Sequence, residues 1–234
     1  MLVSMAAGAE ELRYRVRHDH LFKDGHGLLV IDERGVSYRE ETKKKKPHAG
    51  GWDYVDIQQL IVAPDKVVVL TYQDRPWWVA GIDREFEFKL EPGQDLKPVY
   101  RMLKDKLDQR FVAELSDPAV EPVWEIPVKL TGFPQGSEGV LKVGRDRVVY
   151  ETAKKRESRT WRDGDIENIS TSGRFELTIV TYEREIGEYG RRRGFQFQLK
   201  QPLDERRYQE LWRRLSREKD LTFLNSIEES GKLP

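Results

Sequence analysis

The chain has 234 residues, of which 41 are basic and 41 acidic, and it contains no cysteine. A net charge of zero argues against a protein that holds nucleic-acid phosphates by a bulk positive field. The lack of cysteine excludes a disulfide framework and thiol chemistry, and no apolar run of the sequence is long enough to span a bilayer.

The first residues, MLVSMAAGAEE, carry only part of the pattern of an export signal. No basic residues precede the apolar part, as they do in a complete signal peptide. The small residues Ala7, Gly8 and Ala9 are typical of the end of such a signal, whose start would then lie upstream. A disordered start is the alternative. The sequence therefore leaves open whether the protein is cytoplasmic or exported.

A duplicated pattern organises the remainder of the chain. The stretch GWDYVDIQQL around Trp52 recurs as TWRDGDIENI around Trp161, 109 positions later, whereas Tyr38 and Tyr150 are 112 positions apart. An offset that is constant within blocks and changes between them is typical of duplicated strands joined by loops of variable length. We therefore predict two domains at residues 10–115 and 124–219, a linker at 116–123 and a C-terminal tail at 220–234.

Alternation of polar and apolar residues predicts a series of strands in each copy. The first copy is expected to have strands at 13–17, on both sides of Gly35, and at 52–62, 66–74 and 84–90, with a basic loop at 42–51. The second copy is expected to have strands near 124–131, 139–144, 147–153, 165–170, 174–183 and 193–200. Apolar residues at helical spacing predict a closing helix in each copy, at 95–111 and 204–218.

This element order resembles the pleckstrin-homology-like fold, including its GRAM-type relatives. The segments that carry the resemblance are GLLVIDERGVSY and GVLKVGRDRVVY, WDYVDI and WRDGDI, and the closing helices. The resemblance implies a mainly β fold of two tandem repeats, each a β-barrel or roll capped by a C-terminal α-helix. It also implies a binding scaffold for phospholipid headgroups or proteins. Trp212 is similar to the tryptophan that such helices often pack into the end of the sheet.

Basic residues in equivalent loops of the two copies form a candidate binding surface, together with two adjacent tryptophans. Clustered positive charge can hold phosphate, carboxylate or an anionic membrane surface, although a solvated loop is the simpler interpretation. Of two adjacent tryptophans on a strand only one can point inward, so either the other meets a partner or both pack on the neighbouring repeat. The candidate residues are Lys43, Lys44, Lys45, Lys46, Trp77, Trp78, Lys154, Lys155, Arg156, Arg191, Arg192 and Arg193.

Four residues shared by the two copies are interpreted as structural. Asp56 and Asp165 begin the same Asp-Ile pair. A carboxylate at the start of a strand commonly accepts backbone N–H bonds or pairs with an arginine. Trp52 and Trp161 are expected to pack over the edge of the core.

His18 and His20 are two positions apart on a predicted strand, so they share a face and could reach one metal ion. The second copy has Leu130 and Gly132 at these positions, and no third ligand at a fixed spacing completes a site. Packed or surface histidines are the simpler interpretation, and we expect no metal or other cofactor.

The sequence shows neither a glycine-rich phosphate loop that opens a helix nor a nucleophile elbow. The predicted function is therefore a non-catalytic tandem binding module rather than an enzyme. A protein partner is preferred, an anionic lipid surface is the first alternative, and a metal-assisted enzyme using His18 and His20 is the second. Nucleic acid is not expected as a partner, and no pattern indicates the oligomeric state.

Overall fold

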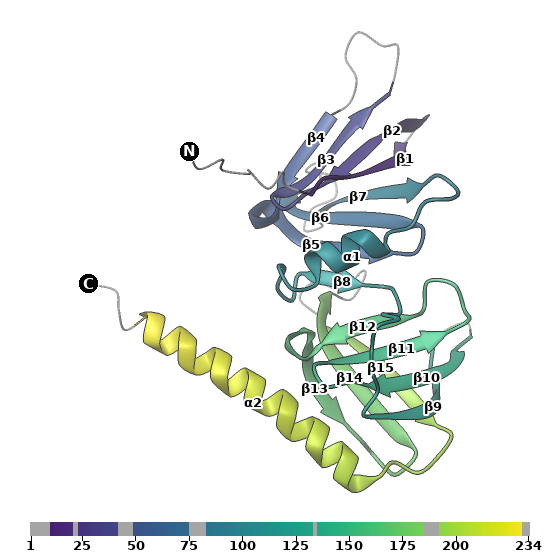
Figure 1. Cartoon of the computed structure of the whole chain (residues 1–234), viewed down its shortest axis with the longest axis vertical. Helices are drawn as coiled ribbons and strands as arrows, with labels where there is room; N and C mark the ends of the chain where they lie inside the picture. Colours follow the sequence, from purple (N-terminus) through teal and green to yellow (C-terminus); the bar gives the residue numbers. More distant parts are fainter. Residues whose placement is uncertain are drawn as a thin grey trace, which may run out of the picture. The chain divides into compact units, whose positions relative to one another are not determined.

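The computed structural model describes residues 10–20, 23–41, 49–74, 83–132, 135–184 and 192–230. The chain divides into two compact units, Met1–Phe111 and Val112–Pro234. Both units are mainly β (Figure 1). Among the described helices, none is both long enough and apolar enough to cross a membrane.

The described part of the first unit contains an antiparallel ladder followed by a short helix. The strands pair in the order β5-β6-β7-β1-β2-β3-β4, so β4 and β5 end the ladder and the sheet is not closed into a barrel. The elements are β1 (Leu12–His20), β2 (Lys23–Ile31), β3 (Gly35–Glu40), β4 (Ala49–Asp53), the 3-10 turn η1 (Tyr54–Asp56), β5 (Ile57–Ala63), β6 (Lys66–Asp74), β7 (Asp83–Leu90) and α1 (Lys97–Leu103).

The second unit repeats this ladder and adds one short strand to it. The described order is β13-β14-β15-β9-β10-β11-β12-β8. The elements are β8 (Phe111–Ala113), β9 (Trp124–Leu130), β10 (Ser137–Val143), β11 (Arg147–Thr152), β12 (Arg159–Arg162), the 3-10 turn η3 (Asp163–Asp165), β13 (Ile166–Ser170), β14 (Glu176–Arg184), β15 (Arg192–Leu199) and α2 (Glu205–Ser230).

The two ladders have the same register, and therefore the duplication seen in the sequence is also a duplication of strand pairing. Matching pairs are Leu29–Tyr38 with Leu141–Tyr150, Val36–Trp52 with Val148–Trp161, and Val16–Leu90 with Val128–Leu199. Even the irregularity at the start of β5 recurs, since the register shifts between Ile57 and Gln59 in one unit and between Ile166 and Asn168 in the other.

Alternation along the strands places one face of each ladder in a core. In the second unit Leu141, Tyr150, Trp161 and Phe197 are almost completely buried, and α2 contributes Leu211 to the same cluster. Burial of this apolar surface is the main force that holds each unit together.

A glycine on the second strand lets neighbouring strands approach closely in both units. A Cβ on Gly27 would lie 2.4 Å from the carbonyl oxygen of Arg39, and a Cβ on Gly139 would lie 2.3 Å from that of Glu151. No other residue fits these positions without displacing a backbone, which explains why the same residue type stands at both.

The strand predicted at 52–62 is wrong as a single element, because the structure divides it into β4, η1 and β5. Trp52 is buried on β4, whereas Val55 in the turn is highly exposed. The 3-10 turn redirects the chain between the two ends of the ladder, so alternation does not continue through it. The strand β12 was not predicted, since Arg159–Arg162 is too short for alternation to show.

The helix bounds also differ from the prediction. Helix α1 ends at Leu103 rather than at residue 111, although Leu103 and Leu107 have helical spacing. The chain turns instead through Asp108, whose carboxylate accepts hydrogen bonds from the backbone N–H and the guanidinium of Arg110. Helix α2 continues to Ser230, well past residue 218, because neither glycine nor proline interrupts it.

Candidate functional site

An extended segment lies on the outer edge of β12 in the second unit. This segment, Val112–Asp117, opens the unit, and its Ala113 pairs antiparallel with Thr160. The hydroxyl of Thr160 donates a hydrogen bond to the carbonyl oxygen of Leu115 (2.7 Å) and accepts one from the backbone N–H of Asp117 (3.0 Å). One side chain of β12 thus holds the segment at two further points.

Charged side chains hold the same segment from a second direction. Glu114 accepts a hydrogen bond from the guanidinium Nη2 of Arg159 (2.9 Å), and its Oε1 lies 3.8 Å from Nη1 of Arg193. Glu183 of β14 lies between the same two arginines, 4.0 Å from Arg159 and 3.6 Å from Arg193. Two carboxylates and two guanidinium groups therefore form one cluster, which we call the ionic cluster.

The ionic cluster is largely buried and borders on aromatic rings. Arg159 and Glu183 are 4% and 6% exposed. Trp161 donates its indole N–H to Glu183 (2.8 Å), while the guanidinium groups of Arg159 and Arg193 lie over the ring of Phe195. Burial of charge is costly unless it is compensated, and these groups compensate one another.

Burial changes the acid–base properties of the cluster. It raises the pKa of the Glu183 carboxyl, an effect that the nearby arginines oppose. It lowers the pKa of the Arg159 guanidinium, while Glu114 and Glu183 act in the opposite direction. Arginine nevertheless remains charged in proteins. The carboxylates face guanidinium groups rather than an open cleft, so the arrangement is suited to holding a segment in place.

A second ion pair fixes the end of the same segment. Asp117 is 4% exposed, and its carboxylate lies 2.6 Å from Nη1 of Arg147 on β11. Arg147 also donates to Asp146. Asp117 is the second residue of the predicted linker, residues 116–123, so the start of that stretch is held by β11 of the second unit.

The predicted basic surface is only partly within the described residues. Lys43, Lys44, Lys45, Lys46, Trp77, Trp78 and Arg191 lie outside them. Lys154 donates to the carbonyl oxygen of Gln135 (2.9 Å) and pairs with Glu157 (2.7 Å).

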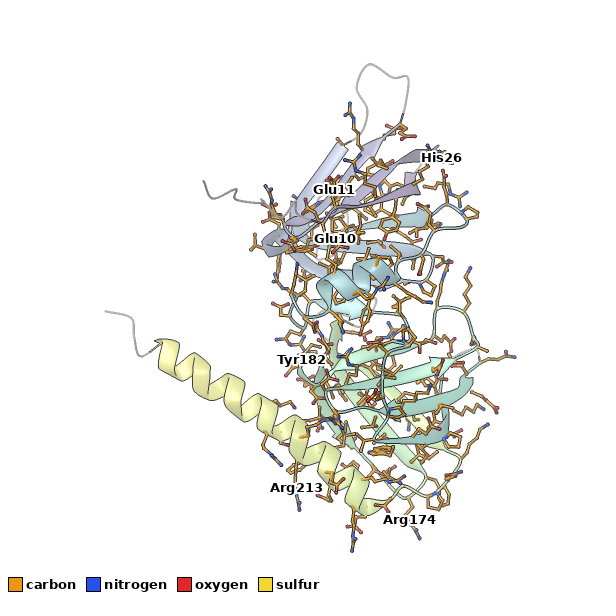
Figure 2. The ribbon with its side chains drawn as sticks, viewed as in Figure 1. Glu10, Glu11, His26, Arg174, Tyr182 and Arg213 are labelled. Atoms are coloured by element: carbon orange, nitrogen blue, oxygen red, sulfur yellow. The ribbon has the colours of Figure 1, made fainter. Side chains whose placement is uncertain are left out.

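Of the other predicted basic residues, Lys155 and Arg156 are exposed but each interacts with neighbouring groups. Arg192 lies over the ring of Tyr182, which is labelled in Figure 2. Arg193 belongs to the ionic cluster. Within the described residues, Lys154, Lys155 and Arg156 are thus exposed, whereas Arg193 is engaged in the ionic cluster.

Three of the residues interpreted as structural make the contacts expected of them. Trp52 and Trp161 are both buried, with ring centroids 4.6 Å from Phe86 and 4.8 Å from Phe195. Asp165 accepts hydrogen bonds from the backbone N–H and guanidinium of Arg162, as predicted.

Asp56 and Trp212 do not follow the prediction. Asp56 is exposed, because Asp53 stands where the second unit has Arg162. Trp212 is 45% exposed, and the expectation that it packs into the sheet is wrong. Leu211 and Leu215 take that role, since each is 3% exposed within the core of the second unit. Arg213 points away from the strands on the outer face of the helix (Figure 2).

The histidines provide no metal centre in the described part of the chain. His18 is buried among the rings of Tyr38, Phe86 and Phe88, and its Nδ1 lies 2.8 Å from the carbonyl oxygen of Glu87. The side chain of His20 lies outside the described residues. No group of three or more potential metal ligands occurs among the described side chains.

Sequence reasoning missed Glu114, Arg159 and Thr160. The equivalents of Arg159 and Thr160 in the first copy are Gly50 and Gly51, so the repeat gave no signal at these positions. Glu114 lies outside the repeated blocks. The one available signal was Arg159 itself, a charged residue two positions before the repeated Trp161 and therefore on the same face of a strand.

Comparisons with known proteins show only a distant structural similarity. No family model matches the chain, and no curated protein matches it. Among solved structures, one described as "Structure of the Spt16D Pob3N heterodimer" is similar at 12% sequence identity and a TM-score of 0.31. The match covers 75% of this chain and 84% of that one.

Proposed function

We propose that the chain is a non-catalytic protein-binding module. The observation that carries this proposal is the segment Val112–Asp117 on the outer edge of β12. Here the fold holds an extended peptide by backbone pairing, a side-chain hydroxyl and ion pairs. Addition of a strand to a sheet edge is a general mode of peptide recognition, in which the backbone supplies affinity and side chains supply specificity.

Ion pairs made by the basic residues support a protein partner over an anionic membrane surface. Lys154 is paired with Glu157, and Arg193 faces Glu114 and Glu183. Positive charges that are already neutralised contribute little attraction to an anionic lipid surface. Lipid binding through Lys43–Lys46 stays a prediction, since those residues lie outside the described part of the chain.

Selection from a random displayed decapeptide library on the immobilised full chain tests the proposal. Selected peptides are then made with a fluorescent label, and their binding is measured by anisotropy. We expect saturable binding with one or two sites for each chain. In parallel, flotation with vesicles that contain phosphatidylserine is expected to leave the protein unbound at roughly physiological salt.

Two results would count against the proposal. Vesicle association that disappears as salt is raised, without any selected peptide, would favour the lipid surface. Failure to select a binding peptide, combined with turnover of a small molecule, would favour an enzyme. A matched control is the same selection on the urea-unfolded chain, which is expected to yield no saturable binder.

A further inference from the structure

The outer edge of β4 in the first unit is the counterpart of the edge that carries the segment in the second unit. The offset of 109 equates Gly51 with Thr160 and Trp52 with Trp161. Both tryptophans pair with the equivalent valine of the preceding strand, so the two edges also correspond in register.

At equivalent positions of β4 and β12, the backbone N–H groups have the same orientation relative to the preceding strand of their own unit. The N–H of Tyr54 donates to the carbonyl of Arg34, and the N–H of Asp163 donates to that of Asp146, each at 3.1 Å. In an antiparallel ladder, residues alternate between facing the partner strand and facing away from it. It follows that Gly51 and Thr160, three positions before these donors, direct their N–H and C=O groups away from the ladder.

The backbone N–H and C=O groups that face away from the ladder are paired with another strand at Thr160 in the second unit. At Gly51 in the first unit, no described strand pairs with them. Thr160 meets Ala113 of β8. On β4, the described ladder ends, and Ala49, Gly51 and Asp53 are all exposed. An exposed strand edge is a template for pairing with another chain.

The first unit also has an arginine that is equivalent to one of the arginines of the ionic cluster. Arg84 is the counterpart of Arg193, which meets Glu114, and both guanidinium groups lie over the equivalent phenylalanine, at 4.9 Å and 5.2 Å from the ring centroid. Val69 pairs with Phe86 as Ile179 pairs with Phe195, so β6 and β14 correspond at an offset of 110, and Gln73 stands where the second unit has Glu183. Arg84 is exposed, and no described carboxylate lies within ion-pair distance of its guanidinium.

We propose that the outer edge of β4 binds an extended, acidic segment of a partner protein by antiparallel strand addition. The backbone of Gly51 supplies the central pair, and Arg84 receives a carboxylate of the segment as Arg193 receives Glu114. This inference rests on the proposed protein-binding function and specifies its site and the chemistry of its partner.

Hydrogen exchange of the full chain, followed by NMR, is the first test. Without any ligand, the amide of Gly51 is expected to exchange about 100-fold faster than the equivalent amide of Thr160, because only the second is paired. Equal protection of the two amides would show that another segment already covers β4, and would overturn the proposal.

Titration with a synthetic peptide of residues 112–118, VAELSDP, is the second test. We expect saturable shifts of the Gly51 and Asp53 amide signals at roughly millimolar peptide, a concentration typical of a single short strand. A peptide with glutamine in place of its glutamate is expected to bind about threefold to fivefold more weakly, as is the wild-type peptide to Arg84→Gln.

Substitutions at Gly51 distinguish backbone pairing from nonspecific adhesion. Gly51→Pro removes the outward N–H without touching the bonds to β3, and edge strands tolerate proline in that orientation. Gly51→Ala is the matched control, since its Cβ would have no neighbour closer than 4.0 Å. We expect binding to be lost in the first variant and kept in the second.

The outcomes separate this inference from the proposed function. Equal binding by the two Gly51 variants, or shifts confined to other strands, would overturn the β4 site, and so would the lack of any shift. The library selection would still decide whether the chain binds peptides at all. If Gly51→Pro does not fold, the Arg84→Gln titration decides alone.

Discussion

At the residue scale, the second unit depends on a carboxyl group that is buried beside two arginines. Glu183 accepts the indole N–H of Trp161, but its Oε2 atom has no hydrogen-bond partner. An ionised carboxylate in that position is stabilised by this one hydrogen bond and by the guanidinium groups of Arg193 and Arg159, which lie 3.6 Å and 4.0 Å from Oε2. Burial raises its pKa, so the folded chain holds a proton on Glu183 more tightly than the unfolded chain does.

The pH dependence of stability follows from this direction. Because the folded-state pKa is above the unfolded value, the stability contributed by protonation is fully present below the unfolded pKa and is lost as the pH rises through the folded pKa. The variant Glu183→Gln cannot ionise. We therefore expect its melting temperature, relative to wild type, to rise as the pH is raised above the ordinary pKa of a glutamate.

Differential scanning calorimetry at several pH values measures this difference. Glu210→Gln is the matched control, since Glu210 is exposed on α2 and its replacement should leave the pH profile unchanged. A difference between Glu183→Gln and wild type that stays constant with pH would contradict the assigned pKa direction.

The residues also show where a repeated sequence predicts a contact and where it does not. The sequence predicted the pairing of Asp165, and Arg162 provides it. It predicted the same for Asp56, but a repeated aspartate does not guarantee a repeated partner, and Asp53 replaces the arginine in the first copy. A contact needs both of its residues to be repeated.

At the element scale, the closing helix of the second unit shows how a helix face is chosen by packing. The sequence placed Tyr208, Leu211, Trp212 and Leu215 on one apolar face. In the structure Leu211 and Leu215 are buried, whereas Trp212 lies largely outside the contact. Neighbouring positions on a helix are about 100° apart, so only one of Leu211 and Trp212 can point at the sheet.

Alanine substitutions on α2 test this assignment. We expect Leu211→Ala to lower the free energy of unfolding by about 2–5 kcal/mol, because it leaves a cavity in the core. Trp212→Ala is expected to change it by less than about 1 kcal/mol, since surface substitutions have small effects. Urea unfolding followed by circular dichroism measures both changes. A larger loss of unfolding free energy for Trp212→Ala than for Leu211→Ala would show that Trp212 packs into the sheet after all.

Elements with strong alternation were predictable, and elements defined by tertiary contacts were not. The strands β14 and β15 were predicted to within about two residues at each end, within ordinary boundary error. By contrast, β8 has three residues and β12 has four. Strands so short are stabilised by the neighbours that they pair with, and a single sequence does not identify those neighbours.

At the scale of the whole molecule, the two units have one pattern of strand pairing but different polar chemistry. Trp52 and Trp161 occupy equivalent positions and pack on equivalent phenylalanines. Only Trp161 faces a glutamate, because Gln73 stands at the matching position of the first unit. The sequence predicted the duplication, but the polar partners became visible only when strands distant in the chain were paired.

A comparison of the same substitution in the two units tests this difference. Trp52→Phe and Trp161→Phe remove similar volumes from similar surroundings. The second variant also leaves a buried carboxylate without its donor, which costs about 1–3 kcal/mol more. Urea unfolding of both variants measures the difference. Equal losses would mean that the indole N–H of Trp161 contributes nothing to stability.

The change of offset from 112 to 109 between Tyr38 and Trp52 has a practical consequence. The chain has accommodated two lengths between the same pair of strands, while Val36–Trp52 and Val148–Trp161 remain aligned. Since the entropy cost of closing a loop grows slowly with its length, further residues there should cost little. An affinity tag or a fluorophore inserted between Glu41 and Ala49 would therefore report on this protein while leaving its architecture intact.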